Sequence, residues 1–307
     1  MTPQNTTVVS FDQQGIARAA ALILAGDCVA VPTETVYGLA ADATNGQAVA
    51  RIYEAKGRPA FNPLIVHVST LEDAQALAVF DDAACDLARR YWPGPLTLVL
   101  PARPGSPIAP LATAGLTTIA LRVPAHRAMR ALLAACGRPL AAPSANASGR
   151  ISPTTADHVV ASLNGRIPLI LNDGATHNGL ESTIVAVDAA GRRLLRPGPV
   201  TAEDLGLVPT QSDRIEAPGQ LASHYRPKKP IVLNRTAASA ETWLIGFGPV
   251  AGDASLSSTG NLVEAAARLF ACLHEADASD RTTIAVAPIP FTGLGAAIND
   301  RLSRAAA

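Results

Sequence analysis

Hydrophobic residues recur along the chain at two spacings, which predict alternating helices and strands. Residues 13–25 place Ile16, Ala20, Ile23 and Leu24 on one helical face and end at a Gly-Asp pair, a common way to end a helix. Short runs rich in β-branched residues follow such segments and are typical of buried strands. We expect helices over 13–25, 48–55, 73–91, 126–136 and 155–163, and strands over 28–31, 64–68, 96–100, 118–123, 140–142, 169–171 and 182–187. This alternation predicts an α/β domain built on a large twisted sheet.

The periodicity lapses in a polar, proline-bearing stretch, which predicts a linker between domains. The simpler interpretation of this stretch is a flexible spacer. Beyond it the two spacings return, with strands expected over 231–234, 243–246 and 284–288 and helices over 262–277 and 294–304. The sequence therefore predicts a large domain over 1–207, a linker over 208–230 and a small α/β domain over 231–307.

Composition narrows the possible functions. Apolar residues make up 48% of the 307 residues, enough for a substantial core. Lys plus Arg and Asp plus Glu both number 25, so the chain lacks the net charge of a strong nonspecific nucleic-acid or membrane binder. The longest apolar runs are far too short to span a bilayer, and the N-terminus lacks the pattern of a signal peptide. We therefore expect a cytoplasmic protein with no membrane partner.

Four cysteines are scattered along the chain without the spacing of a metal site or a redox pair. They are Cys28, Cys85, Cys136 and Cys272. We expect reduced thiols, and no metal site built from protein ligands.

The segment PTETVYGL, residues 32–39, places two hydroxyls, a carboxylate and a phenol directly after a predicted strand. Polar groups at the end of a strand in an open α/β sheet commonly face the ligand crevice. In the competing interpretation, Thr33 and Thr35 only cap a turn and Tyr37 only packs. Thr35 is the candidate for ligand contact.

The segment KGRPAFNPL, residues 56–64, holds two cations, Lys56 and Arg58, at a predicted helix end. A compact ammonium and a planar guanidinium together suit a polyphosphate better than either alone. A basic helix end facing solvent is the alternative, because it interacts favourably with the helix dipole.

Two further polar side chains interrupt apolar strands. His67 lies in LIVHV, where a structural histidine is as reasonable as a ligand contact. Arg122 lies in TIALRVP, and a buried guanidinium requires an anionic partner. A substrate carboxylate or an internal Asp or Glu would each meet that requirement.

The loop APSANASG (142–149) carries closely spaced hydroxyl and amide groups that can bind phosphate or ribose. The segment SPT (152–154) either continues this loop or caps the helix that follows. GLESTIV (179–185) places a hydroxyl at the start of a strand and LRPG (195–198) places an arginine before a turn, and neither is specific alone. The chain contains no GxSxG and no GxxxxGK[ST], so neither a serine hydrolase nor a P-loop is indicated.

Taken in order, PTETVYGL, KGRPAFNPL, WPGPLTLVL, LRVPAH, PSANASGRISPT, GLESTIV and LRPG closely resemble the YrdC-type threonylcarbamoyladenylate synthases. The later segments APGQLASHYRP and GLGAAINDRLSRA resemble the long, two-domain form of that family. The resemblance implies a large twisted mixed sheet with helices, a small Rossmann-like C-terminal domain, and a linker that closes over the cleft.

The resemblance also implies roles for individual residues. L-threonine would contact Thr35, His67, Arg122, Ala142 and Ser182. ATP would contact Arg58, Asn62, Thr118, Ser144, Ser152, Arg196 and a linker residue, His224 or Tyr225, of which we choose Tyr225. Lys56 and Arg58 are the candidates for catalysis, because they would stabilise charge on the phosphates.

The reaction implied is the joining of L-threonine, bicarbonate and ATP into threonylcarbamoyl-AMP and pyrophosphate, for modification of adenosine 37 in tRNA. Magnesium would accompany ATP, and a downstream threonylcarbamoyl transferase would take the product. A weak contact with tRNA or duplex RNA is also expected. The rival interpretation is a noncatalytic RNA-binding or regulatory module of the same fold.

Overall fold

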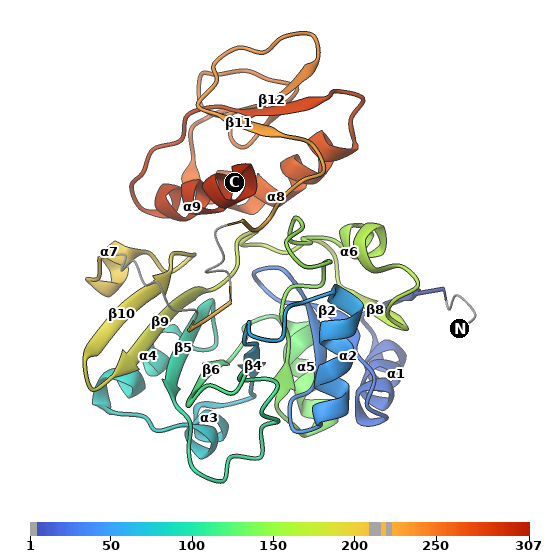
Figure 1. Cartoon of the computed structure of the whole chain (residues 1–307), viewed down its shortest axis with the longest axis vertical. Helices are drawn as coiled ribbons and strands as arrows, with labels where there is room; N and C mark the ends of the chain where they lie inside the picture. The colour runs from blue at the N-terminus through green and yellow to red at the C-terminus, as the bar shows by residue number, and fades with distance from the viewer. Residues whose placement is uncertain (1–4, 209–215, 219–222) are drawn as a thin grey trace.

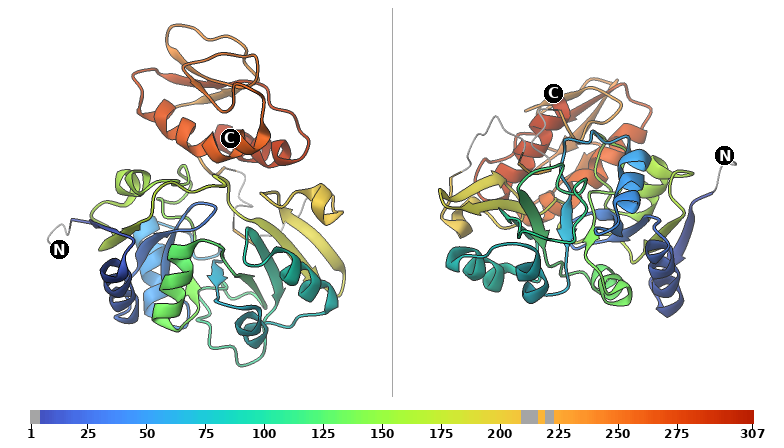
Figure 2. Two further views of the ribbon diagram at one scale, coloured as in Figure 1. Left: turned by 180° about the vertical axis from the view of Figure 1, so that it is seen from behind. Right: turned by 60° about the horizontal axis from the view of Figure 1, so that its bottom comes forward.

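Two α/β units make up the described part of the chain. The computed structural model describes residues 5–208, 216–218 and 223–307 (Figure 1). The larger unit occupies the lower part of Figure 1, and the smaller unit, coloured orange to red, lies above it. The view from behind in Figure 2 shows the same stacking, with two helices of the small unit turned toward the large one.

Ten strands of the larger unit form one mixed sheet in the order β1-β8-β2-β3-β7-β4-β6-β5-β9-β10. The strands are β1 (Thr7–Ser10), β2 (Val29–Pro32), β3 (Tyr37–Asp42), β4 (Ile65–His67), β5 (Leu96–Pro101), β6 (Thr118–Arg122), β7 (Leu140–Ala141), β8 (Leu169–Asn172), β9 (Thr183–Asp188) and β10 (Gly191–Arg196). Neighbours are parallel at β1/β8, β2/β8, β4/β6 and β5/β9 and antiparallel elsewhere. The predicted large mixed sheet is confirmed.

Helices pack on the two faces of this sheet. They are α1 (Gln13–Leu24), α2 (Gly46–Lys56), α3 (Leu71–Leu77), α4 (Asp82–Tyr91), α5 (Arg127–Cys136), α6 (Ala156–Leu163) and α7 (Ala202–Leu205). Alternate residues of one strand enter different cores, as the period of a strand requires. Val29 and Val31 of β2 pack with α1 and α5, whereas Ala30 between them packs into the main core on the other face.

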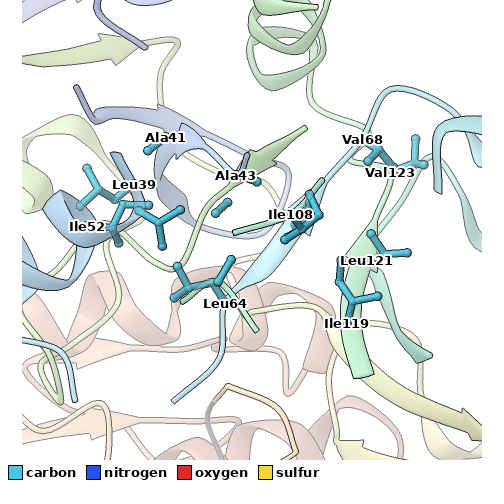
Figure 3. Packing of buried hydrophobic residues seen from close by; sticks show 14 of the residues in the cluster. Leu39, Ala41, Ala43, Ile52, Leu64, Val68, Ile108, Ile119, Leu121 and Val123 are labelled. Carbon is cyan, nitrogen blue, oxygen red and sulfur yellow. The ribbon is translucent and has the colours of Figure 1, made fainter. Parts of the chain in front are cut away.

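The main core joins the middle of the sheet to α2, α3, α4 and α6. Leu39 of β3, Ile52 of α2 and Leu64 before β4 meet in it, with Ile119 and Leu121 of β6 nearby (Figure 3). On the opposite face, the neighbouring strands β4, β6, β5, β9 and β10 present a smaller apolar cluster. That cluster includes Ala217 from the linker and no residue of any described helix. The linker therefore packs on this part of the sheet.

One predicted helix, over 73–91, is wrong as a single element. The structure has α3 and α4 instead, with an extended segment between them. There the Val79 amide donates to the Pro101 carbonyl, so this segment pairs with the end of β5. The Asp81 side chain then accepts from the Ala84 amide and begins α4. The sequence pattern also missed β1, β3, β10 and α7.

The smaller unit is a parallel four-stranded sheet in the order β11-β14-β12-β13. Its elements are β11 (Ile231–Leu233), β12 (Thr242–Gly246), β13 (Ala254–Ser255), α8 (Leu262–Ala278), β14 (Thr283–Val286) and α9 (Leu294–Ala306). This agrees with the predicted Rossmann-like domain, apart from the short β13, which the pattern missed.

Helices α8 and α9 contact the larger unit directly. Their apolar core also contains Val36, Ile151 and Leu180 from that unit. Gly179 shows how close the approach is, because a β-carbon there would come within 2.4 Å of the α8 carbonyl oxygens, and its φ of +66° also favours glycine. The two units therefore share one hydrophobic core.

The predicted linker over 208–230 is described only in part. Residues 209–215 and 219–222 lie outside the described residues. Ala217 and Tyr225 are both 0% exposed, so the described pieces pack against the protein and do not form a free spacer. None of the helices in the described ranges combines the length and apolar character needed to cross a lipid bilayer.

The main core generates a graded stability prediction at Ile52, which is 0% exposed. Ile52→Val should lower the free energy of unfolding by about 1 kcal/mol and Ile52→Ala by about 2–5 kcal/mol, because each deletion leaves a larger cavity. Urea denaturation followed by circular dichroism measures both values. Val8→Ala, at a position 45% exposed, is the control and should change stability little. Equal losses at Ile52 and Val8 would contradict the packing described.

Candidate active site

A pocket opens where the ends of several sheet strands meet the linker. Its cavity volume is about 50 Å³. Residues predicted to contact L-threonine and residues predicted to contact ATP both line this pocket. They are Thr35, Arg58, His67, Arg122, Ala142, Ser144, Ser182, Arg196 and Tyr225. The sheet therefore gathers residues that are far apart in sequence, as expected for strand ends in an α/β sheet.

The parallel strands β4 and β6 place His67 beside Arg122. The two residues are Cα partners in the strand register, at the last position of each strand. Arg122 is 3% exposed, and its Nη2 lies 2.6 Å from Glu34 Oε1. Its Nε donates to the Gly94 carbonyl at 3.2 Å, and its Nη1 donates to Thr35 Oγ1 at 3.1 Å. An internal carboxylate therefore pairs with this buried cation, which is one of the two partners that the sequence left open.

The hairpin between β2 and β3 brings Thr35 to the pocket. Thr33 Oγ1 accepts from the amides of Thr35 and Val36 and donates to the Val36 carbonyl, so Thr33 caps the turn. Tyr37 is 0% exposed, and its hydroxyl donates to the Gly174 carbonyl at 2.7 Å. Thr33 therefore caps the turn and Tyr37 packs in the core, while Thr33 and Thr35 both line the pocket.

His67 is buried without a hydrogen-bond partner for either ring nitrogen among the described residues. Burial, and then the charge of Arg122, lower its pKa to about 3. The ring is therefore neutral at physiological pH and a weak base. It is suited to hydrogen bonding with a ligand rather than to removing a proton.

Arg58 and Arg196 bring two more buried cations to the pocket. Arg58 Nη2 donates to the Pro63 carbonyl at 2.8 Å, and burial lowers its pKa to about 10. Arg196 Nη2 donates to the Ser182 carbonyl at 2.8 Å, and its Nη1 donates to the Pro218 carbonyl at 3.2 Å. Backbone carbonyls satisfy both guanidinium groups without neutralising them, so their charge is available to an anionic ligand.

Other predicted ATP contacts lie outside the lining of the pocket in the described chain. The Lys56 ammonium is buried and donates to the carbonyls of Ser144 and Asn146, so it holds the loop after β7 in place. Burial lowers the pKa of Lys56 well below its usual value. Ser152 donates to Glu181, and Thr118 lies at the far end of β6 from Arg122, about 13 Å along the strand.

Asn62 also supports the pocket from outside its lining. Its backbone carbonyl accepts from Arg58 Nε at 3.1 Å and from the Tyr53 hydroxyl at 3.0 Å. Its side-chain oxygen is buried and has no partner in the described ranges.

Sequence reasoning assigned no role to two carboxylates that line or border the pocket. Glu34 pairs with Arg122, and Glu181 pairs with Arg301 of α9 at 2.9 Å. Glu34 lies in PTETVYGL and Glu181 lies in GLESTIV. An acidic residue next to a predicted buried strand was therefore the feature of the sequence that could have identified each of them. The partners could not be identified because they are distant in sequence.

The residues around the pocket do not form a metal cage. Within the described ranges, no group of three or more His, Cys, Asp or Glu side chains is placed to hold an ion. Glu34 and Glu181 are both engaged by arginines.

Known families match both units. Residues 21–198 match the family model described as "Telomere recombination", and residues 199–307 match the model described as "Threonylcarbamoyl-AMP synthase, C-terminal domain". The chain belongs to the threonylcarbamoyl-AMP synthase family. The Bacillus subtilis threonylcarbamoyl-AMP synthase is 39% identical over 98% of this chain and 95% of its own. A relative from Mycobacterium tuberculosis is 37% identical over 64% of this chain and 89% of its own.

The fold matches a solved member of the family. The structure titled "Crystal structure of P. abyssi Sua5 complexed with L-threonine" superposes with a TM-score of 0.89 at 35% identity. It covers 98% of both chains, so both units and their relative placement are shared. The sequence resemblance to YrdC-type synthases of the long form is thereby confirmed.

The Glu34–Arg122 pair generates a pH prediction. Burial alone would raise the pKa of Glu34. The charge of Arg122 and the hydrogen bonds to the carboxylate together outweigh this effect, so the pKa lies below the usual 4.5. The pair therefore stabilises the fold fully above pH 4.5, and this contribution is lost as the pH falls through the lower folded pKa. Glu34→Gln should cost about 3–5 kcal/mol at neutral pH and remove this part of the acid dependence, because Arg122 loses its anion.

Thermal unfolding of both proteins between neutral and acidic pH measures the effect. Glu54→Gln, on an exposed position of α2, is the matched control and should behave like the unmodified protein. If the unmodified protein and Glu34→Gln lost stability in parallel with pH, the pair would not have the stated role.

Proposed function

We propose that this protein is a threonylcarbamoyl-AMP synthase, a nucleotidyltransferase that converts L-threonine, bicarbonate and ATP into threonylcarbamoyl-AMP and pyrophosphate. Full-length similarity to the family supports this, and so does the pocket. The observation that carries the proposal is the set of three buried arginines, Arg58, Arg122 and Arg196, around one cavity. Such a site suits two anionic reactants, an amino acid and a nucleotide.

The threonine end of the pocket is proposed to lie around Arg122. The guanidinium would bind the amino-acid carboxylate, and Thr35 and neutral His67 would hydrogen-bond the remaining polar groups. Ala142, directly after β7, and Ser182, directly before β9, complete this set. The Pyrococcus abyssi relative was solved with L-threonine, in agreement with an amino-acid site in this fold.

The ATP end is proposed to lie around Arg58 and Arg196, and Ser144 and Tyr225 line the same pocket. Lys56 would act indirectly, because its ammonium fixes the loop that carries Ser144. Asn62 would act in the same way through Arg58, and Ser152 through Glu181. Thr118 is proposed as a contact at the outer end of the nucleotide.

The mechanism needs no protein nucleophile. The threonine amine adds to carbon dioxide derived from bicarbonate, and the resulting carbamate oxygen attacks the α-phosphorus while pyrophosphate leaves. The arginines align the two anions and stabilise the charge that develops on the phosphates. Magnesium, bound to ATP, would neutralise part of the same charge. His67 positions threonine and is not the base, because its pKa is about 3.

The linker is proposed to cover the nucleotide. Pro218, His224 and Tyr225 of the linker line the pocket together with Arg58 and Arg196. We propose that the product passes to a threonylcarbamoyl transferase acting on tRNA in the cytoplasm. A purely RNA-binding role is less well supported, because the arginines of the pocket are buried and cannot reach a duplex.

Pyrophosphate release tests the function. The purified protein should release pyrophosphate from ATP only when threonine and bicarbonate are both present, and the products should include a mass for threonylcarbamoyl-AMP. Omission of each substrate in turn is the control. A protein that binds ATP but releases no pyrophosphate would reject the synthase and favour the regulatory alternative.

Arg58 tests the arrangement of the site. Arg58→Ala should lower kcat/KM for ATP by about thirtyfold, or about 2 kcal/mol, because a charge-assisted contact in the transition state is lost. Steady-state pyrophosphate release measures the change. Arg89→Ala removes an exposed arginine from α4 and should leave the rate unchanged. Full activity in a folded Arg58→Ala protein would remove Arg58 from the mechanism.

A further inference from the structure

Arg301 of α9 connects the small unit to the wall of the pocket. It is 0% exposed, although it is a charged residue on a surface-forming helix. Its Nε donates to Glu181 Oε2 at 2.9 Å, and its Nη1 pairs with Asp300 at 2.7 Å. Burying a guanidinium is costly, and an apolar side chain of similar size often stabilises an interface as well or better. Packing between the units alone does not require this charge.

Glu181 is the point at which Arg301 meets the pocket. It lines the cavity, and its other carboxylate oxygen accepts from Ser152. The next residue, Ser182, accepts from Arg196 through its carbonyl and its hydroxyl. Glu181 therefore contacts Ser152, a member of the proposed ATP set. It is also next in the chain to Ser182, which accepts from Arg196 of the same set.

Arg301 also contacts Tyr225. The guanidinium carbon of Arg301 lies 5.4 Å from the centre of the Tyr225 ring. The ring centres of Tyr225 and of Phe270, on helix α8, are 5.5 Å apart. Tyr225 has a φ of +65°, a backbone conformation that residues other than glycine rarely adopt. Its hydroxyl has no hydrogen-bond partner in the described ranges. The small unit thus holds a strained residue that lines the pocket and has a free polar group.

We infer that Arg301 is a positioning residue for the active site: it holds Glu181 and Tyr225 as a rigid wall for ATP, so the C-terminal unit sets the affinity for the nucleotide. This inference rests on the proposed function. The threonine contacts Thr35, His67 and Arg122 lie on β4, β6 and the β2–β3 hairpin, and Arg301 contacts none of them in the described ranges. Ser182 is a proposed threonine contact that follows Glu181 in the chain, so the effect should fall mainly on ATP and only weakly on threonine.

The test compares Arg301→Met, Glu181→Gln and the double variant. Each should raise KM for ATP by about tenfold or more, with a much smaller change in kcat and in KM for threonine. The double variant should be no worse than the worse single variant, because both changes remove one interaction. It also removes both charges, so it keeps the test available if Arg301→Met leaves Glu181 unpaired and fails to fold.

Two matched variants serve as controls. Arg301→Lys keeps the charge and should recover part of the affinity for ATP. Arg235→Met removes an exposed arginine from the same unit and should change nothing. A folded single or double variant with unchanged KM for ATP would overturn the inference, as would equal changes in kcat and in both KM values.

Titration calorimetry with ATP alone separates the two proposals. If the unmodified protein releases no pyrophosphate, the synthase proposal fails, but the ATP titration still tests Arg301. In that case, weaker binding by the double variant supports the inference, and equal binding rejects it.

Discussion

The structure depends on keeping several guanidinium groups charged while they are buried. A buried cation without partners is costly, so each arginine of the pocket must find oxygen atoms inside the protein. Arg122 uses Glu34 and the Gly94 carbonyl, whereas Arg58 and Arg196 use mainly backbone carbonyls, with the Ser182 hydroxyl as a further partner of Arg196. These partners come from loops between strands, so the loops are fixed by the same contacts that fix the charges.

The two faces of the sheet are covered differently on the side of the pocket. On the face that carries α3 and α4, the neighbouring strands β4, β6, β5, β9 and β10 contribute side chains to the main core. On the other side, the apolar cluster is small and includes Ala217 of the linker. The pocket lies where the strand ends meet this linker, and Arg196 is bound to the Pro218 carbonyl there.

Much of the fold and most of the pocket lining could be predicted because the signals are local. A buried strand followed by polar residues marked Thr35, and a charge inside an apolar strand marked Arg122. Pairings between distant residues could not be predicted, and Arg301 and Glu181 are 120 positions apart. The break between α3 and α4 was missed for the same reason, because it depends on pairing with the end of β5. Strand β10, GRRLLR, was missed because its charges hide the strand pattern.

The core shared by the two units limits how this protein can be divided. Val36, Ile151 and Leu180 of the larger unit pack with α8 and α9, and Gly179 leaves no room for a side chain there. A protein cut after the first unit would expose these apolar residues to water and would be prone to aggregate. Shorter relatives, such as the one from Mycobacterium tuberculosis, align with only 64% of this chain. A chain of this family that ends with its first unit would need polar side chains at these positions, because they would then face water.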